Sequence, residues 1–385
     1  MFIRLAYNYL HDSWRYLVGF VVIFIIWQLG SLPFVLVAML KIFADGGDIS
    51  SLEDPNIVMT ILDSNLTLFL MLLSFVIGLL GLIFWIKKVH KQPMLSVTTT
   101  RKKVDWGRFG FGFGLIAIVT VVLTTLDYYG NPDAYILQFE TGPFIVLAII
   151  AILLVPLQTS FEEYLFRGYL MQGIGVSTHN QKFPFFLIYC ILLFSAYGYI
   201  VSNLELPVFL NITILLAGFG LLFLLLTSSA LDSLIVNPVY SKFHKFLMSN
   251  FVPLFITSTI FGGLHFFNPE VDKLGPIIMV YYIGTGFFLG IITLMDEGME
   301  LALGFHAGNN LVAALLVTAD WTAFQTNSIL KDISEPVAGV DVLIPVLIVY
   351  PILLGIMAWR YKWTNWKEKL FGKIEPPAEE VPIIE

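Results

Sequence analysis

Long apolar runs separated by short polar segments make up most of this chain. A membrane-spanning helix needs about 20 mostly apolar residues, and the runs lack the period-two alternation that is typical of strands. The pattern therefore predicts an all-α fold, a polytopic transmembrane helical bundle of about 8–10 spans. The candidate helices are residues 17–40, 66–86, 109–126, 143–170, 183–202, 207–227, 251–267, 275–295, 299–318 and 342–359.

The composition supports the same fold class. Hydrophobic residues make up 57% of the 385 residues and charged residues only 13%, whereas soluble domains carry about 25% charged residues. We therefore expect the lipid bilayer to be the solvent around the protein. The single cysteine, Cys190, excludes an intrachain disulfide and a cysteine-based zinc site. The first apolar run is too long for the core of a signal peptide, so we expect it to remain as a span.

Charged residues alternate between basic and acidic along the chain. The N-terminal stretch, the segment 87–108 and the segment 360–373 are basic, while the loops 45–63 and 127–140 are acidic. Because cytoplasmic loops of membrane proteins are enriched in Lys and Arg, this alternation predicts a multi-pass protein with both termini in the cytoplasm. The basic residues do not form the footprint of a nucleic-acid-binding protein, so no nucleic-acid partner is expected.

The polar motifs divide the chain into three regions. Residues 1–142 are predicted to be N-terminal transmembrane helices joined by the basic cytoplasmic loop 87–108. Residues 143–318 carry the polar intramembrane motifs, interrupted by a hydrophobic insertion at about 183–245 that is predicted to form two additional spans. Residues 319–385 hold the last transmembrane helix and a charged cytoplasmic tail.

The first polar motif follows an apolar run without an intervening loop. Glu162 and Glu163 are adjacent, so their side chains lie about 100° apart around a helix and serve different purposes. Glu163 and Arg167 are four residues apart and can pair on one face. Glu162 then lacks that partner, and a carboxylate in a poorly solvated site has the raised proton affinity that suits a general base. The alternative interpretation is a helix end that emerges among lipid headgroups, with both acids solvated.

Two histidines lie inside other apolar segments. His265 closes one segment, four residues after Phe261, and His306 shares a helical face with Asn310 in another. Polar residues in these positions also serve as hydrogen-bonding links between helices, which is the alternative interpretation of each motif. The remaining histidines fall in predicted loops or helix ends and are expected to be solvated: His11, His90, His179 and His244.

The combination of these motifs is more informative than any one of them. Polar groups in lipid must find one another, so we expect the three helices to converge. A carboxylate, two histidines and an amide in one wet cavity are typical of a hydrolytic site.

The order of the motifs resembles a known family. Glu-Glu-x-x-x-Arg, then Phe-x-x-x-His, then His-x-x-x-Asn, all on hydrophobic helices, is similar to the CAAX protease and bacteriocin-processing enzymes (the CPBP or Abi family), which are intramembrane glutamate proteases related to the type II CAAX prenyl endopeptidase. The matching residues are Glu162, Glu163, Arg167, Phe261, His265, His306 and Asn310. The gap between Glu163 and Phe261 is much longer than is usual in that family, because of the insertion.

The resemblance implies hydrolysis of a peptide bond in a membrane-associated substrate, in a cavity open to the cytoplasm of a bacterial plasma membrane. Glu162 would activate water that His265 also holds, and His306 and Asn310 would stabilise the oxyanion. Glu163 and Arg167 would orient the helix. The family has also been discussed as metal-dependent; no metal or other cofactor is favoured, and zinc, if bound, would take Glu162, His265 and His306 as ligands.

Two other functions fit the same residues. One is a non-catalytic membrane scaffold or bacteriocin self-immunity protein that keeps the fold. The other is a proton-coupled transporter, because intramembrane Glu and His also form proton relays; the paired repeats of many transporters are not found in this sequence. The sequence predicts neither the identity of the substrate, nor a role for prenylation, nor the oligomeric state.

Overall fold

The computed structural model describes residues 1–48, 60–204, 207–336 and 339–377. Glu53 and Asp54 of the predicted acidic loop, and residues 378–385 of the predicted tail, lie outside the described residues. The first part of the chain forms η1 (Phe2–Asn8), α1 (Ser13–Leu29), α2 (Leu32–Ala44), α4 (Ser64–Lys88), α5 (Met94–Thr98) and α6 (Trp106–Gly130).

The middle part contains the longest helical segment and the insertion. Its elements are η3 (Pro132–Ala134), β1 (Tyr135–Leu137), α7 (Thr141–Glu163), the π-helical η4 (Tyr164–Leu170), α8 (Met171–Ser177), α9 (Phe183–Asn203), α10 (Val208–Thr227), η5 (Ser229–Leu231), α11 (Asp232–Ile235) and α12 (Pro238–Leu247).

The last part completes the bundle. Its elements are α13 (Phe251–Gly263), η6 (Leu264–Phe267), α14 (Pro269–Leu274), α15 (Ile278–Asp296), α16 (Glu300–Leu316), β2 (Val317–Ala319), β3 (Leu330–Asp332), η7 (Val340–Leu343), the π-helical η8 (Pro345–Val349), α17 (Tyr350–Tyr361) and α18 (Trp366–Phe371).

The predicted all-α polytopic fold is confirmed, and each of the ten candidate ranges contains a helix. Among the described residues, six helices are long and apolar enough to cross a membrane, and a bent pair at 213–235 would make a seventh. The helices at 251–267 and 345–361 are apolar but shorter, and α16 has 17 residues. By length and composition alone, six or seven of the candidate helices in the described ranges reach full spanning length.

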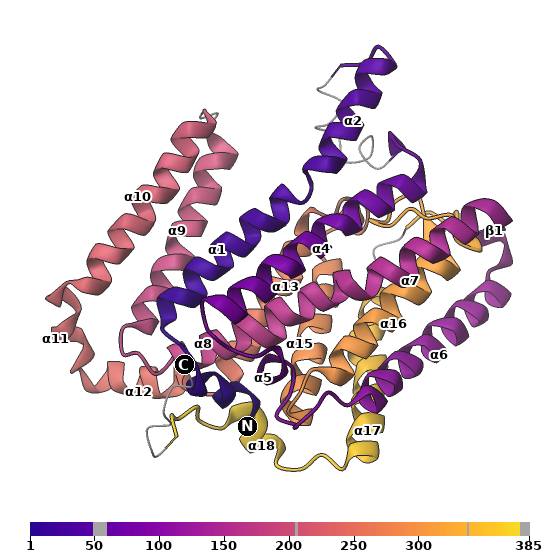
Figure 1. The fold of residues 1–385 in the computed structure, drawn as a ribbon. Helices are drawn as coiled ribbons and strands as arrows, with labels where there is room; N and C mark the ends of the chain where they lie inside the picture. The colour runs from indigo at the N-terminus through magenta and orange to yellow at the C-terminus, as the bar shows by residue number, and fades with distance from the viewer. Residues whose placement is uncertain (49–59, 205–206, 337–338, 378–385) are drawn as a thin grey trace.

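The helices that carry the polar motifs lie together in the centre of the bundle (Figure 1). In this central group α16 packs against both α6 and α7, and α13 packs against α15. The contact between α6 and α16 is close because glycines face backbone: a Cβ on Gly304 would lie 2.0 Å from the carbonyl oxygen of Phe109, and one on Gly112 would lie 2.5 Å from that of Leu301. Small residues of this kind let helices in a membrane approach closely.

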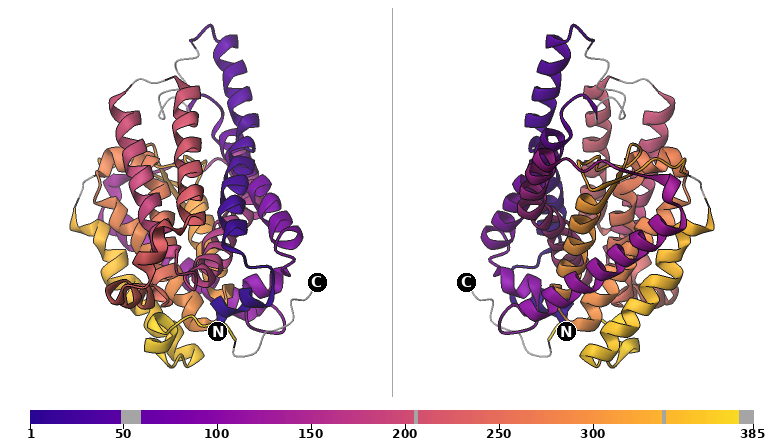
Figure 2. Two further views of the ribbon diagram at one scale, coloured as in Figure 1. Left: turned by 90° about the vertical axis from the view of Figure 1, so that its left-hand side faces the viewer. Right: turned by 90° about the vertical axis from the view of Figure 1, so that its right-hand side faces the viewer.

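The insertion forms a helical hairpin at one side of the bundle. Helices α9 and α10 pack against each other, and the two views of Figure 2 show them as a separate pair beside α1. The hydroxyl of Tyr189 donates a hydrogen bond to the carbonyl of Gly218 across the hairpin, at 2.9 Å. Many of its large apolar side chains are exposed, Leu192 and Phe223 among them, which suits contact with lipid.

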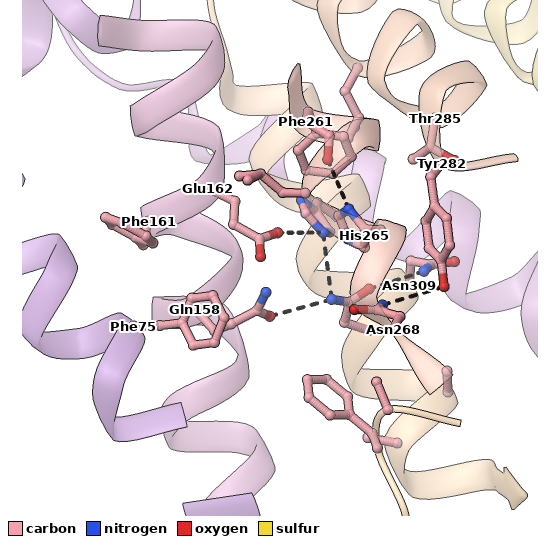
Figure 3. A pocket seen from close by; sticks show the side chains of 18 of the residues that line it. Phe75, Gln158, Phe161, Glu162, Phe261, His265, Asn268, Tyr282, Thr285 and Asn309 are labelled. Carbon is pink, nitrogen blue, oxygen red and sulfur yellow. Dashed lines mark hydrogen bonds and ion pairs between the residues drawn. The ribbon is translucent and has the colours of Figure 1, made fainter. Parts of the chain in front are cut away.

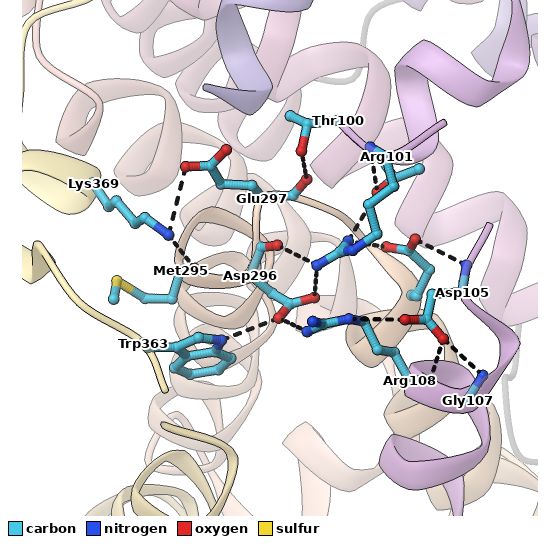
Figure 4. A network of polar contacts seen from close by, with 12 residues as sticks. Thr100, Arg101, Asp105, Gly107, Arg108, Met295, Asp296, Glu297, Trp363 and Lys369 are labelled. Atoms are coloured by element: carbon cyan, nitrogen blue, oxygen red, sulfur yellow. Dashed lines mark hydrogen bonds and ion pairs between the residues drawn. The ribbon is translucent and has the colours of Figure 1, made fainter. Parts of the chain in front are cut away.

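The two ends of the bundle differ in character. At one end a small sheet of three short strands, in the order β1-β3-β2, joins the loops; no strands were expected from the sequence. At the other end, which holds η1 and α18, Arg101 forms ion pairs with Asp296 at 2.8 Å and with Glu300 at 3.0 Å. The indole of Trp363 donates to Asp296 at 3.1 Å. This network, shown in Figure 4, fastens the basic loop 87–108 to the α15–α16 turn.

Two of the histidines that were expected to be solvated are buried, so that prediction is wrong for them. The His90 side chain is fully buried, with Nδ1 2.7 Å from the carbonyl of Leu10. His244 is 8% exposed, and its Nε2 lies 2.9 Å from the carbonyl of Thr178. Both lie in segments that look like loops or amphipathic ends in the sequence, but segments distant in the chain cover them.

Candidate active site

The motif on α7 separates the two glutamates as the helical spacing predicts. Glu163 and Arg167 are fully buried and form an ion pair at 2.9 Å. Arg167 also donates to the carbonyl of Gly286 on α15, at 3.2 Å, and its guanidinium lies 4.1 Å from the centre of the Phe261 ring. Glu162 points to another side, where 14% of its side chain is exposed. The predicted pairing of Glu163 with Arg167 is confirmed.

His306 of α16 lies between the two glutamates. Its Nδ1 is 2.8 Å from Oε1 of Glu163, and its Nε2 is 3.4 Å from Oε2 of Glu162. Because an ionised carboxylate only accepts hydrogen bonds, Nδ1–H donates to Glu163, which directs Nε2 toward Glu162. Asn310 lies one turn further along the same face, with Nδ2 3.5 Å from Nε2 of His306. Polar side chains of α7 and α16 are therefore in direct contact, as expected for helices that converge.

His265 lies in the short 3₁₀ segment that follows α13. Its Nδ1 is 2.8 Å from the carbonyl of Phe261, so Nδ1–H donates and the neutral ring has Nε2 as an acceptor. The ring stacks on Tyr282 with centroids 4.4 Å apart. Phe261 is buried among Arg167, His265 and His306 and fills the space between them; its centroid is 5.0 Å from that of His265 and 5.9 Å from that of His306.

A cavity of about 390 Å³ brings these residues together. Glu162, His265, His306 and Asn310 all line it, together with Phe261, while the buried Glu163 and Arg167 lie behind the lining. Figure 3 shows Glu162 directed from α7 toward the wall that carries His265. None of the lining residues belongs to the basic segment 87–108 or to α18, so the lining gives no support to a cavity open at the basic end.

The predicted ranges 143–170 and 251–267 put Glu162 near the cytoplasmic end of its span and His265 near the opposite end of its own, but the structure places the two at similar depths. The helix of Glu162 does not end at residue 170 but continues to Ser177 near η1. Glu162 is therefore 15 residues from that end, or about 22 Å along a helix. His265 lies 14 residues after the start of α13 at Phe251, about 21 Å along. Both starting points lie at the basic end of the bundle, because α8 packs against η1 and Phe251 stacks on Phe371 of α18.

Several lining residues were missed as site candidates. Gln158 accepts a hydrogen bond from Asn310 at 3.3 Å; its position one turn before Glu162 was the available signal. Asn268, Glu270 and Tyr282 line the far part of the cavity, and Nδ2 of Asn268 is 3.5 Å from the hydroxyl of Tyr282. Asn268 and Glu270 follow His265 closely in the sequence, whereas only the packing of α15 brings Tyr282 to the site.

A metal site needs several ionisable side chains arranged around one point. Within the described residues, no group of three or more His, Cys, Asp or Glu side chains is arranged to hold a metal ion. Glu162, His265 and His306, the predicted ligands if zinc is bound, therefore do not converge as a ready ligand set.

Comparison with known proteins bears on the predicted family. The family model of the type II CAAX prenyl endopeptidase, Rce1-like, matches residues 233–312. Residues 233–312, which we call the Rce1-like domain, are similar to this family. This domain contains Phe261, His265, His306 and Asn310, so the resemblance predicted from the motifs is confirmed. The matched range begins after the α9–α10 hairpin and does not include Glu162.

One curated relative extends beyond the Rce1-like domain. The uncharacterized protein YyaK of Bacillus subtilis (strain 168) is 24% identical over 306 residues, which cover 79% of this chain and 78% of YyaK. No solved structure matches the chain significantly.

Proposed function

We propose that this protein is an intramembrane endopeptidase in which Glu162 activates the attacking water. The observation that carries the proposal is the cavity in which Glu162, His265, His306 and Asn310 meet, inside a bundle of apolar helices. The similarity of residues 233–312 to the type II CAAX prenyl endopeptidase Rce1-like family supports the proposal. The substrate is a membrane-associated peptide or protein.

The proposed reaction begins with a water molecule held between two acceptors. The carboxylate of Glu162 and Nε2 of His265 each accept one of its hydrogen bonds. Glu162 takes a proton as the water oxygen attacks the carbonyl carbon of the scissile bond, and later transfers it to the leaving nitrogen. This division of roles uses the tautomer of His265 that the Phe261 carbonyl imposes.

In the proposed reaction, two side chains of α16 stabilise the negative charge that develops on the oxygen of the scissile carbonyl group. Nε2 of His306, when protonated, and Nδ2 of Asn310 donate to the oxyanion. One such donor contributes about 2.7–4 kcal/mol to stabilisation of the transition state. Glu163 does not contact the substrate in this scheme. It holds the His306 ring through Nδ1, and Arg167 holds Glu163.

We further propose that this protein lies in a bacterial plasma membrane with both termini in the cytoplasm, and that residues 143–318 form its functional core. The basic segments at the η1 and α18 end support this orientation, because basic residues favour the cytoplasmic side.

The test compares the termini of membrane peptides in cells that express either the wild-type protein or Glu162→Gln. We expect cleavage products to fall by about 10²–10⁴-fold in the variant, the usual contribution of a general base. Glu140→Gln, the same exchange at an exposed position beside the start of α7, is the matched control and should cleave normally. A chelator, with and without added zinc, tests metal dependence in the same assay.

Identical profiles for wild type and Glu162→Gln, with both proteins inserted and stable, would remove the support for catalysis. The non-catalytic scaffold or immunity function would then be the better explanation. A pH-dependent flux that Glu162→Gln abolishes would instead favour the transporter.

A further inference from the structure

Glu270 is a carboxylate in the cavity that the proposed reaction does not use. It lies at the start of α14 and lines the cavity at the end where Asn268 and Tyr282 lie. Its Oε1 accepts a hydrogen bond from the backbone N–H of Ala323 at 2.8 Å. Its Oε2 is buried and has no hydrogen-bond partner among the described residues. Burial raises the pKa of this carboxyl above its ordinary value.

Glu270 also lacks a cationic partner. Within the described part of the chain it forms no ion pair with Lys, Arg or His. His265 acts on it electrostatically but is not within ion-pair distance. A buried carboxylate is costly unless it is paired. The structure therefore holds an unpaired carboxyl group that lines the cavity, and one of its oxygens is buried without a hydrogen-bond partner among the described residues.

The cavity lining contains two carboxyl groups and no lysine or arginine that could neutralise them. Its acidic residues are Glu162 and Glu270, and none of the lining residues is Lys or Arg. Most of the other lining side chains are apolar or aromatic, Phe75 and Phe324 among them. A ligand that carries a positive charge gains from this field, and a free carboxylate is repelled by it. A charge-assisted hydrogen bond to Oε2 would remove the cost of its burial.

We propose that Glu270 is a specificity-determining residue that binds a Lys or Arg side chain of the substrate, close to the bond that is cut. This inference rests on the proposed function, because the ligand is taken to be a peptide. Since an extended chain advances about 3.3–3.6 Å per residue and Glu270 shares one cavity with Glu162, the basic residue lies within a few positions of the scissile bond. The same field disfavours a substrate whose free C-terminal carboxylate enters this end of the cavity.

A purely structural role for Glu270 would work through Ala323, by holding the loop after β2 against the cavity. The two roles can be separated because Glu270→Gln keeps one side-chain oxygen to accept the Ala323 N–H and replaces the other oxygen with an uncharged NH2 group. Glu270→Ala removes both. Glu335→Gln, an exposed exchange in the loop that follows β3, is the matched control for the loss of one carboxylate.

The first experiment measures binding, so it does not depend on turnover. The detergent-purified full chain is titrated with fluorescent apolar decapeptides in which one position, moved along the peptide, is Lys, norleucine or Glu. We expect at least one Lys peptide to bind the wild type about tenfold or more tightly than its norleucine counterpart, and the Glu peptide to bind more weakly than both. Glu270→Gln should abolish the Lys preference at unchanged thermal stability, while Glu335→Gln should retain it.

Equal affinities for the Lys and norleucine peptides at every position would overturn the proposal. So would a Lys preference that survives in Glu270→Gln. A loss of binding in Glu270→Ala that Glu270→Gln does not share would assign the residue to the Ala323 loop instead.

The second experiment uses cleavage sites mapped in membranes. Under the proposal, Lys and Arg are enriched near the bonds cut by the wild type, and the enrichment falls in Glu270→Gln. Cuts that depend on Glu162 but show no such enrichment would refute the role of Glu270 and leave the protease intact. Termini that do not depend on Glu162 would refute the protease, and the binding experiment would still decide whether Glu270 selects cations.

Discussion

Glu163 shows how one side chain can organise a site without facing its cavity. Its Oε1 accepts from both Arg167 and His306, at 2.9 and 2.8 Å. The neighbouring Glu162 is left to face the cavity, as the 100° turn between adjacent helical residues requires. The sequence was sufficient to predict this division, because an i, i+4 pair depends only on local geometry.

Residues joined by distant packing were not predictable in the same way. The tether of Glu270 to Ala323 crosses 53 positions, and nothing local indicates it. His90 follows α4 in a polar segment, so the sequence predicts a solvated side chain. In the structure its ring centroid lies 4.3 Å from that of Tyr16, and its Nε2 lies 3.2 Å from the Tyr169 hydroxyl. Burial of this kind depends on which distant segment covers the loop.

The buried His90 should make stability depend on pH. Burial lowers the pKa of His90 from 6.5 to about 4, so the unfolded chain binds a proton at a higher pH than the folded chain does. Stability is therefore full above about pH 6.5 and declines as the pH falls toward 4, by about 2–3 kcal/mol in all. Thermal unfolding in detergent between pH 7.5 and 4.5 measures this decline.

The control for this prediction is His90→Asn, whose amide can still donate to the Leu10 carbonyl but does not titrate. The variant should lose the part of the pH dependence that lies between pH 6.5 and 4. An unchanged profile would show that other groups cause the decline.

At the scale of elements, the apolar runs predicted where helices form but not how far each extends. The helix of Glu162 continues seven residues past the predicted boundary at residue 170, to Ser177, because the polar residues that close the run are buried against η1 rather than solvated. Gln172, for example, is 1% exposed and donates to the Phe2 carbonyl at 3.2 Å. The apparent difference in depth between Glu162 and His265 arose from this boundary alone.

The close contact of α6 with α16 fixes the position of His306, so widening it should impair both stability and cleavage. In Gly304→Val the new side chain meets the Phe109 backbone, which cannot yield as a flexible side chain would. We expect a loss of at least about 1–3 kcal/mol of stability and a fall in cleavage, measured by thermal unfolding and by the terminal profile.

Gly114→Val provides the matched control on α6, because nothing lies within 4 Å of a Cβ at Gly114. It should leave both readouts near those of the wild type. Equal effects of the two substitutions would mean that glycine matters here for helix flexibility and not for close packing.

The whole molecule has a basic end and a sheet end, and this polarity determines the orientation expected in a membrane. In a Cys190→Ala background, a cysteine at the exposed Lys103 should be labelled by an impermeant maleimide only after cells are opened. A cysteine at the exposed Asp133 should be labelled in intact cells. The reverse pattern would place the termini outside.

The ion pair inside one helix has a consequence for how the protein is made. A lone arginine at the centre of a span is costly to insert into a bilayer, but Arg167 enters together with Glu163, one turn away on the same helix. The inserting helix therefore carries its own counter-ion, so neutralisation of Arg167 does not depend on the later helix α16. His306 reaches Glu163 only when the later helices associate. We therefore expect this polar centre to assemble in two stages, with charge neutralisation during insertion and completion of the contacts during helix association.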